Sequence, residues 1–275
     1  TDAGIAAAPV RKSRGYWGTV GRRLARDKVS MVCAAVLILI VLAAIFAPVL
    51  GLADPYQGSM IRRLRPIGTP GYPLGTDELG RDMLARLVYG GRLSLLIGIL
   101  PVVLAFGIGT LLGVVAGYFG GKVNTAIMRT VDVFYAFPSV LLAIAISGVL
   151  GAGIVNSIVS LTVVFVPQIT RVAESVTTSV RSLDFVDAAR ASGASAITIM
   201  RVHMLGNVLG PIFVFATSLI AVSMILASGL SFLGLGVKPP EPEWGLMLNT
   251  LRTAIYVQPW VAALPGAMIF ITSIA

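Results

Sequence analysis

Five stretches of more than 20 residues contain no Asp, Glu, Lys or Arg, so each is long enough to cross a membrane. A transmembrane helix needs roughly 20 predominantly apolar residues. The 38 uncharged residues of 133–170 exceed one span, and the segment SGVLGAGIVN supplies a turn between two. We therefore predict six transmembrane helices, at about 30–51, 93–121, 127–147, 154–171 and 210–231 and from about 254 onward.

The composition excludes a water-soluble globule. Of the 275 residues, 56% are hydrophobic and only 12% are charged, whereas soluble domains carry about 25% charged residues. Such a chain has too little polar surface to cover a globule in water, so most apolar side chains must face lipid or one another within lipid. We predict an all-α, polytopic membrane protein.

The basic residues indicate a cytoplasmic N-terminus. Seven of the 21 Lys and Arg residues precede the first apolar run: Arg11, Lys12, Arg14, Arg22, Arg23, Arg26 and Lys28. With six spans, the predicted cytoplasmic segments hold 13 basic residues and the outer segments hold eight, in the direction of the positive-inside rule. This clustering at a membrane boundary explains the net charge of +9 without a nucleic-acid partner.

Two outer segments carry patterned residues. Residues 76–92 place acidic side chains early and arginines late, which complements a helix dipole, and Leu79, Met83 and Leu87 share one face. We predict an amphipathic helix there, which either covers the bundle or contacts a partner. The segment GVKPPEPEWGLMLN holds Trp244, which we place at headgroup depth. Lipid anchoring and a role beside an outer gate both stay open for it.

The second predicted span carries a periodic pattern of glycines. They recur every four residues, at Gly109, Gly113, Gly117 and Gly121. This spacing forms a smooth groove on one helix face, where another backbone approaches closely. The groove fits packing within the chain and contact with another subunit equally well. Prolines in or beside spans would interrupt backbone hydrogen bonds at Pro101, Pro138 and Pro167.

The fourth predicted span carries polar side chains at Asn156, Thr162 and Gln168, which could line a path through it. Asn156 and Gln168 are candidate pathway residues, although helix–helix hydrogen bonds would use the same amides. Asp132 and Glu174 lie near span ends, and each follows by three residues an arginine that we expect to pair with it.

No pattern of catalysis or metal binding accompanies these side chains. The single His excludes H-E-x-x-H, and no G-x-S-x-G occurs. The closest approach to a phosphate-binding loop is GGKVN, where Val123 occupies the position of the required hydroxyl. We expect no catalytic residue, no metal site and no cofactor bound by this chain.

Residues 174–201 are too polar to span a membrane, yet they are regularly patterned. Apolar residues recur at helical spacing up to Val186, Gly193 interrupts, and a second apolar stripe follows. We predict two short helices along the cytoplasmic surface, joined by a bend that glycine adopts without steric cost. The alanines around the bend make it narrow. A narrow protrusion inserts into a groove on another protein, and a helix pair resting on lipid is the alternative.

The stretch DAARASGAS, followed after nine residues by LGN, resembles the EAA loop of ABC-transporter permease subunits. That loop reads E-A-A, three residues, G, nine residues, then I, one residue and L-P. Asp187, Ala188 and Ala189 stand at the E-A-A positions, and Gly193 is the glycine. Asp replaces Glu, and Gly206 replaces the proline.

Three further stretches are similar to the C-type permease subunit of dipeptide and oligopeptide importers: PLGTDELGRDMLARLVYGGRLSLLIG, GYFGGKVNTAIMRTVDVFYAFPSVLLA and SFLGLGVKPPEPEWGLML. The resemblance covers about residues 30–275. It implies one leading helix plus a five-helix type I permease core in a prokaryotic inner or plasma membrane. The expected segments are a basic cytoplasmic 1–29, a first span 30–51, an outer loop 52–91, and a core 92–275 that contains the coupling loop 174–206.

The resemblance implies a heteromeric importer for peptides. The expected partners are a second homologous permease, two ATPase domains that bind ATP and Mg, an extracytoplasmic substrate-binding protein and lipid. The expected ATPase-coupling residues are Asp184, Asp187, Ala188, Ala189, Arg190, Gly193, Ala194 and Ser195. Cargo of another kind, such as nickel or haem, would use the same architecture. A membrane scaffold without transport is the alternative from another class.

Overall fold

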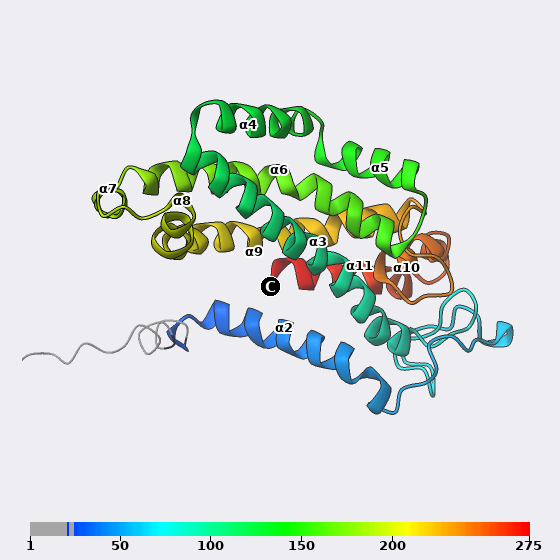
Figure 1. The fold of residues 1–275 in the computed structure, drawn as a ribbon. Coiled ribbons are helices and arrows are strands. Elements are labelled where there is room, and N and C mark those ends of the chain that lie inside the picture. The colour runs from blue at the N-terminus through cyan, green and yellow to red at the C-terminus, as the bar shows by residue number, and fades with distance from the viewer. Residues whose placement is uncertain (1–20, 22–24) are drawn as a thin grey trace, which may run out of the picture.

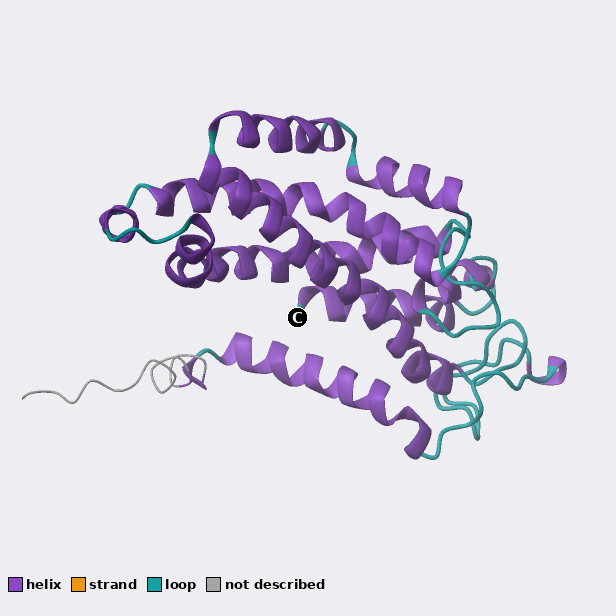
Figure 2. Cartoon of the chain, viewed as in Figure 1, coloured by secondary structure: helices purple, strands orange, loops and turns teal. Residues whose placement is uncertain are grey.

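The computed structural model describes residue 21 and residues 25–275. Within that part of the chain every extended regular element is a helix (Figure 2), and the only β-pairings are the isolated bridges Thr69–Tyr72 and Thr76–Asp82. The predicted all-α class is therefore confirmed for these residues. Most of the basic residues of the predicted cytoplasmic segment 1–29 lie outside the described part.

Among the residues that the structure describes, four helices are long and apolar enough to cross a membrane. They are α2 (Lys28–Phe46, extended by the 3-10 turn η1, Ala47–Val49), α3 (Met83–Phe119), α6 (Ile154–Arg181) and α9 (Leu205–Phe232). The pair α4 (Gly121–Tyr135) and α5 (Ser139–Leu150) adds a fifth if the two count as one broken span. The last apolar helix, α11 (Pro259–Ile274), is shorter. The six-span count therefore stays a prediction.

Shorter elements lie at the two ends of the bundle. One end, formed by the segments that the sequence predicts to lie outside, contains the 3-10 turns η2 (Met60–Arg62) and η4 (Ala254–Tyr256) and the helix α10 (Trp244–Thr250). At the other end lie α7 (Asp184–Ala191), α8 (Ala196–Thr198) and the π-helical turn η3 (Ile199–Met204). In Figure 1, α7 and the start of α2 lie at the same end of the bundle, and the loop that follows α2 lies at the opposite end.

Helix α3 is the centre of the bundle. It makes its largest contacts with α6 and α9, and α2 packs against it from the side opposite α4 and α5 (Figure 1). The predicted amphipathic outer helix is not a separate element, because α3 begins at Met83 and continues through the span to Phe119. Asp82 caps its start by accepting the Leu84 N–H at 2.9 Å. The acidic residues 77 and 78 therefore precede the helix instead of forming its first turn.

Three of the four glycines of the predicted groove pack against α6, whereas Gly121 begins α4 and has nothing within 4 Å of its Cβ position. A Cβ at Gly113 would lie 2.4 Å from the Ala173 Cβ, and one at Gly117 would lie 2.7 Å from the Thr177 Cβ. A Cβ at Gly109 would lie 2.9 Å from the Ile169 Cβ. The repeat thus brings two membrane-length helices into backbone contact.

The third predicted span, 127–147, is wrong as one continuous helix. α4 ends at Tyr135, α5 begins at Ser139, and the two are bent by 87°. Pro138 immediately precedes α5; its ring and missing N–H disfavour a continuous helix there. The predicted turn at 147–156 is confirmed by the loop between Leu150 and Ile154.

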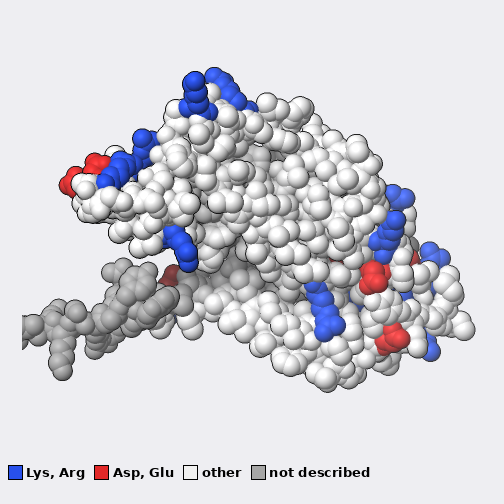
Figure 3. Space-filling model, in the orientation of Figure 1, with Lys and Arg blue, Asp and Glu red and all other residues white. Residues whose placement is uncertain are grey.

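Charge is distributed as a membrane requires. On the face shown in Figure 3, charged side chains lie mainly toward the ends of the bundle, and the surface between them is almost free of charge. Large apolar side chains of the described helices, such as Leu39 and Leu111, are two-thirds exposed. Such a surface is stable against lipid and not against water.

Candidate functional site

The predicted coupling segment protrudes from the end of the bundle as a short helix and a tight turn. α7 ends where the Ser192 N–H donates to the Ala188 carbonyl at 3.0 Å and the Ala194 N–H donates to the Ala189 carbonyl at 3.1 Å. Gly193 takes a φ of +81° between them. This is the geometry of a glycine-terminated helix, so the predicted bend at Gly193 is confirmed.

The second of the two predicted surface helices is the beginning of α9. Ser195 caps it, since its Oγ accepts the Thr198 N–H at 3.3 Å. The chain then runs through α8 and the π-helical turn η3 into α9 without a loop. The apolar stripe of this segment is therefore the first part of a helix that extends to Phe232.

The protrusion is packed onto the bundle. Val186, Ile199 and Met204 are at most 1% exposed and form a small core with Tyr118, at the end of α3. Ala189 points into this core and is only 9% exposed. It therefore supports the protrusion and presents little surface to a partner.

Most of the other predicted coupling residues face outward. Asp184, Asp187, Ala188, Arg190, Gly193 and Ser195 are exposed, and Ala194 is half-buried. The Arg190 guanidinium lies 2.9 Å from the Asp187 carboxylate and 5.6 Å from the centre of the Tyr118 ring. An exposed ion pair contributes little stability. Here it holds the Arg190 side chain beside the exposed small residues Ala188 and Gly193.

The candidate pathway residues Asn156, Gln168 and Trp244 are not brought together. Asn156 donates to the carbonyls of Leu150 and Gly151 at 2.8 and 2.9 Å and so closes the end of α5. Gln168 contacts the Ser139 hydroxyl at 3.4 Å across the α5–α6 interface. Their role along a pathway stays a prediction.

Trp244 is not a lipid anchor. Its side chain is fully buried, and its Nε1 donates to the Leu87 carbonyl at 2.9 Å. The Trp244 N–H donates to Ser94 Oγ at 3.0 Å, so two bonds hold the start of α10 against α3. The lipid-anchoring alternative is therefore wrong, because the amphipathic Trp side chain satisfies its N–H inside the protein instead of at the lipid headgroups.

The expected local ion pairs do not form. Arg171 pairs with Asp132 on the neighbouring helix α4, at 2.5 Å, instead of with Glu174. Glu174 accepts from the Asn124 side chain at 2.5 Å. Both contacts cross between α4 and α6, which sequence spacing within one helix could not reveal.

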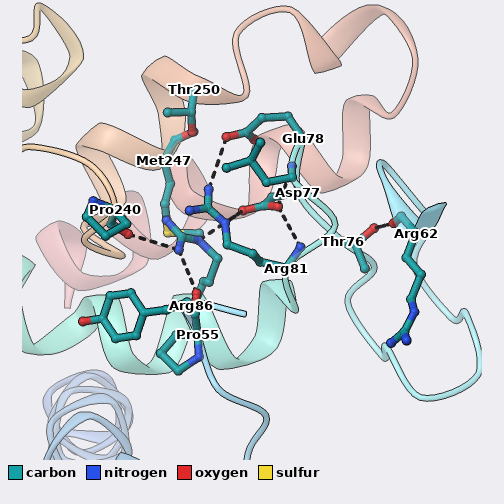
Figure 4. A network of polar contacts seen from close by, with 12 residues as sticks. Pro55, Arg62, Thr76, Asp77, Glu78, Arg81, Arg86, Pro240, Met247 and Thr250 are labelled. Atoms are coloured by element: carbon teal, nitrogen blue, oxygen red, sulfur yellow. Dashed lines mark hydrogen bonds and ion pairs between the residues drawn. The ribbon is translucent and has the colours of Figure 1, made fainter. Parts of the chain in front are cut away.

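An ionic network that the sequence did not predict ties together the outer segments (Figure 4). Asp77, 2% exposed, lies 2.5 Å from Arg81 Nε and 3.3 Å from Arg86 Nε. Arg86 also donates to the carbonyls of Pro55 and Pro240 at 2.9 and 3.4 Å. One buried guanidinium therefore connects α3 to two loops that are far apart in sequence.

Glu243 caps α10 beside this network. Its carboxylate accepts the N–H groups of Gly245 and Leu246, both at 2.8 Å. Burial raises the pKa of the Glu243 carboxyl because it disfavours the charged form, while the backbone hydrogen bonds act in the opposite direction. Among the described residues, no three His, Cys, Asp or Glu side chains gather as a metal site would require.

Comparison with known proteins gives a consistent result. A family model described as binding-protein-dependent transport system inner membrane component matches residues 109–275. A second, described as N-terminal TM domain of oligopeptide transport permease C, matches residues 15–66.

Individual relatives are similar over most of the chain. A glutathione transport system permease protein of Pectobacterium atrosepticum is 37% identical over 274 residues, 98% of this chain and 91% of its own. A di/tripeptide transport system permease protein of Pseudomonas aeruginosa is 40% identical and covers 87% and 80%. A dipeptide transport system permease protein of Alkalihalophilus pseudofirmus is 38% identical and covers 93% and 84%.

Proposed function

This chain belongs to the binding-protein-dependent transport permease family of bacterial inner membranes, and we propose that it forms half of a peptide pathway in an ATP-driven importer. The partners in this proposal are a second homologous permease, two ATPase domains and an extracytoplasmic binding protein. ATP and Mg bind to the ATPase domains, and this chain contributes motion instead of chemistry.

The protrusion at Asp184–Ala191 is the observation that carries the proposal. It is continuous with α6 through residues 182 and 183 and with α9 through α8 and η3. Its base packs against Tyr118 of α3. A push on α7 by an ATPase domain would therefore reach the three central helices of the bundle through packed contacts, which deform little.

The names of the relatives support peptides as cargo. They name glutathione, di/tripeptide and dipeptide transport. Nickel and haem are the alternative cargoes for this architecture. A membrane scaffold is the alternative from another class, and it would require no ATPase on the protrusion.

The test is a pair of substitutions at Gly193. Nothing lies within 4 Å of a Cβ there, so a side chain is limited only by the φ of +81°. We expect Gly193→Val to abolish peptide-stimulated ATP hydrolysis of the reconstituted complex, because β-branched residues rarely adopt this conformation. Gly193→Asn, which tolerates it, retains most of the stimulation.

Membrane insertion and co-purification of the ATPase are measured for both variants. Equal stimulation in Gly193→Val and the parent protein would contradict a coupling role. Isolation of the parent protein from native membranes without an ATPase would favour the scaffold.

A further inference from the structure

An apolar groove lies between α3 and the start of α9. Its volume is about 490 Å³, which is within the roughly 300–1,000 Å³ that is usual for ligand pockets. The walls are mainly aliphatic side chains, among them Leu111, Val114 and Val115 of α3 and Met200, Leu205 and Leu209 of η3 and α9. Arg201 is the only charged residue that lines the groove.

The two walls of the groove run in opposite directions, so its two ends can be assigned. At the end of α3, Tyr118 packs with Ile199 of η3. Farther along, the rings of Phe106 and Phe213 meet edge to face, with their centroids 6.1 Å apart. Arg201 belongs to η3 and therefore lies at the end of the groove beside the protrusion. Phe106 lies at the other end.

The length and surroundings of the groove match one leaflet of a bilayer. Leu111 of α3, Val202 of η3 and Val214 of α9 are each about two-thirds exposed, so the groove lies in a surface that is unstable against water. Its α3 wall falls within the charge-free run 93–121. The nine-residue rise along α3 across the wall 106–115 is about 14 Å, which is about half of the 30 Å hydrocarbon thickness.

Arg201 places a positive charge at the end of this apolar groove. Its side chain is exposed and takes no part in the ion pairs of the described residues. Arg92 lines another apolar groove, between α2 and α3, but its guanidinium donates to the carbonyls of Ala44 and Ile45 at 2.8 and 2.9 Å. Arg92 therefore holds the end of α2, whereas Arg201 is open to a ligand. Guanidinium groups form strong charge-assisted hydrogen bonds with phosphate.

We propose that this groove binds a phospholipid with an anionic headgroup, in the leaflet on the side of α7. One acyl chain lies between α3 and α9 and reaches Phe106, and the phosphate lies against Arg201. A spanning helix of another subunit fits less well, because it would need an apolar groove about twice as long.

The position of Arg201 gives this lipid a place next to the protrusion. Arg201 is part of the π-helical turn η3, which joins α8 to α9, and π-helical turns frequently occur at functional sites. The bound headgroup would therefore contact the joint between the protrusion and the bundle, whatever cargo the protein carries.

Photoactivatable lipids test the site directly. The protein, with the partners that co-purify with it, is placed in vesicles of phosphatidylglycerol and phosphatidylcholine in equal amounts, and one of the two carries a diazirine in its acyl chain. We expect label on residues 106–115 and 197–209, about fivefold more from phosphatidylglycerol, the effect of one basic residue on binding of an anionic lipid. Equal labelling by the two lipids, or no label in the groove because another subunit covers it, would overturn the inference.

Variants of the headgroup contact and of the acyl-chain contact are tested separately. Arg201→Gln should remove the preference for phosphatidylglycerol, whereas Arg129→Gln, an exposed arginine on α4 outside the groove, should keep it. Gly107→Trp should lower labelling by both lipids several-fold, because nothing lies within 4 Å of a Cβ there and the indole would occupy the groove. Gly148→Trp on α5, where a Cβ is equally free, should leave labelling unchanged. A preference that persists in Arg201→Gln would overturn the inference.

A competition in the unchanged protein covers variants that do not assemble. Excess unlabelled phosphatidylglycerol should displace the photoactivatable lipid from residues 106–115, and phosphatidylcholine should do so about fivefold less effectively. Equal displacement by the two lipids would show that Arg201 selects no headgroup, and the proposed site would then be wrong.

Discussion

Asp77 receives two backbone N–H groups, from Leu79 and Arg81, and faces two guanidinium groups while almost fully buried. Its neighbour Glu78 makes a single contact, to Arg81 at 3.4 Å, and its side chain is 19% exposed. Breaking a buried ion pair leaves a charge without a partner, which costs far more than the loss of an exposed pair.

We therefore expect Asp77→Asn to lower the free energy of unfolding by about 3 kcal/mol. Glu78→Gln, the matched control, lowers it by less, because Glu78 makes one contact at 3.4 Å and its Oε2 has no hydrogen-bond partner to lose. The measurement is denaturant unfolding of the purified protein in detergent. Equal losses in the two variants would show that Arg86 holds the loops without help from the carboxylate.

For single residues, the sequence predicted backbone conformation better than it predicted which side chains pair with one another. Gly193 was placed at a bend because only glycine freely takes positive φ, a property local to that residue. The prediction that Arg171 pairs with Glu174 was wrong, because its partner Asp132 lies 39 residues away, on α4. Arg86 was missed as a link for the same reason: its carbonyl acceptors lie 31 and 154 residues away.

At the scale of helices, the contact between α3 and α6 depends on the absence of side chains. We expect Gly113→Ala to destabilise the protein by about 1–3 kcal/mol, because the added methyl overlaps Ala173 and the Thr170 carbonyl. Gly107→Ala, on the same helix with nothing within 4 Å, changes stability by less than about 1 kcal/mol and in the stabilising direction. Thermal unfolding in detergent measures both, and equal effects would contradict the packing role.

Element boundaries show where sequence patterns reach their limit. Charge-free stretches located α2, α9 and the first part of α6, because hydrocarbon excludes charge along a span. They did not show that α6 continues beyond the predicted end at 171 to Arg181. They did not reveal that α3 begins at Met83, because its first turns contain the buried Arg86 and are therefore not free of charge. The break before Ser139 leaves no mark in hydropathy, and only Pro138 signals it.

The whole molecule is a bundle with two chemically different ends. One end carries the protrusion with its exposed Asp187–Arg190 pair, and the other carries the buried network around Asp77 and Arg86. The first is suited to a partner that pushes from outside the fold. The second is suited to holding loops in place, because Arg86 joins Asp77 to the carbonyls of Pro55 and Pro240.

If these two ends lie on opposite sides of the membrane, single cysteines at each end should react with a membrane-impermeant maleimide from different sides. Cys33 is first replaced by Ser, which leaves no native thiol. We expect Lys238→Cys, exposed at the outer end, to label in intact spheroplasts, and Thr125→Cys, exposed in the first turns of α4, to label only after permeabilisation. Labelling of both from the same side would refute the six-span topology with a cytoplasmic N-terminus, because an odd number of spans must separate the two positions.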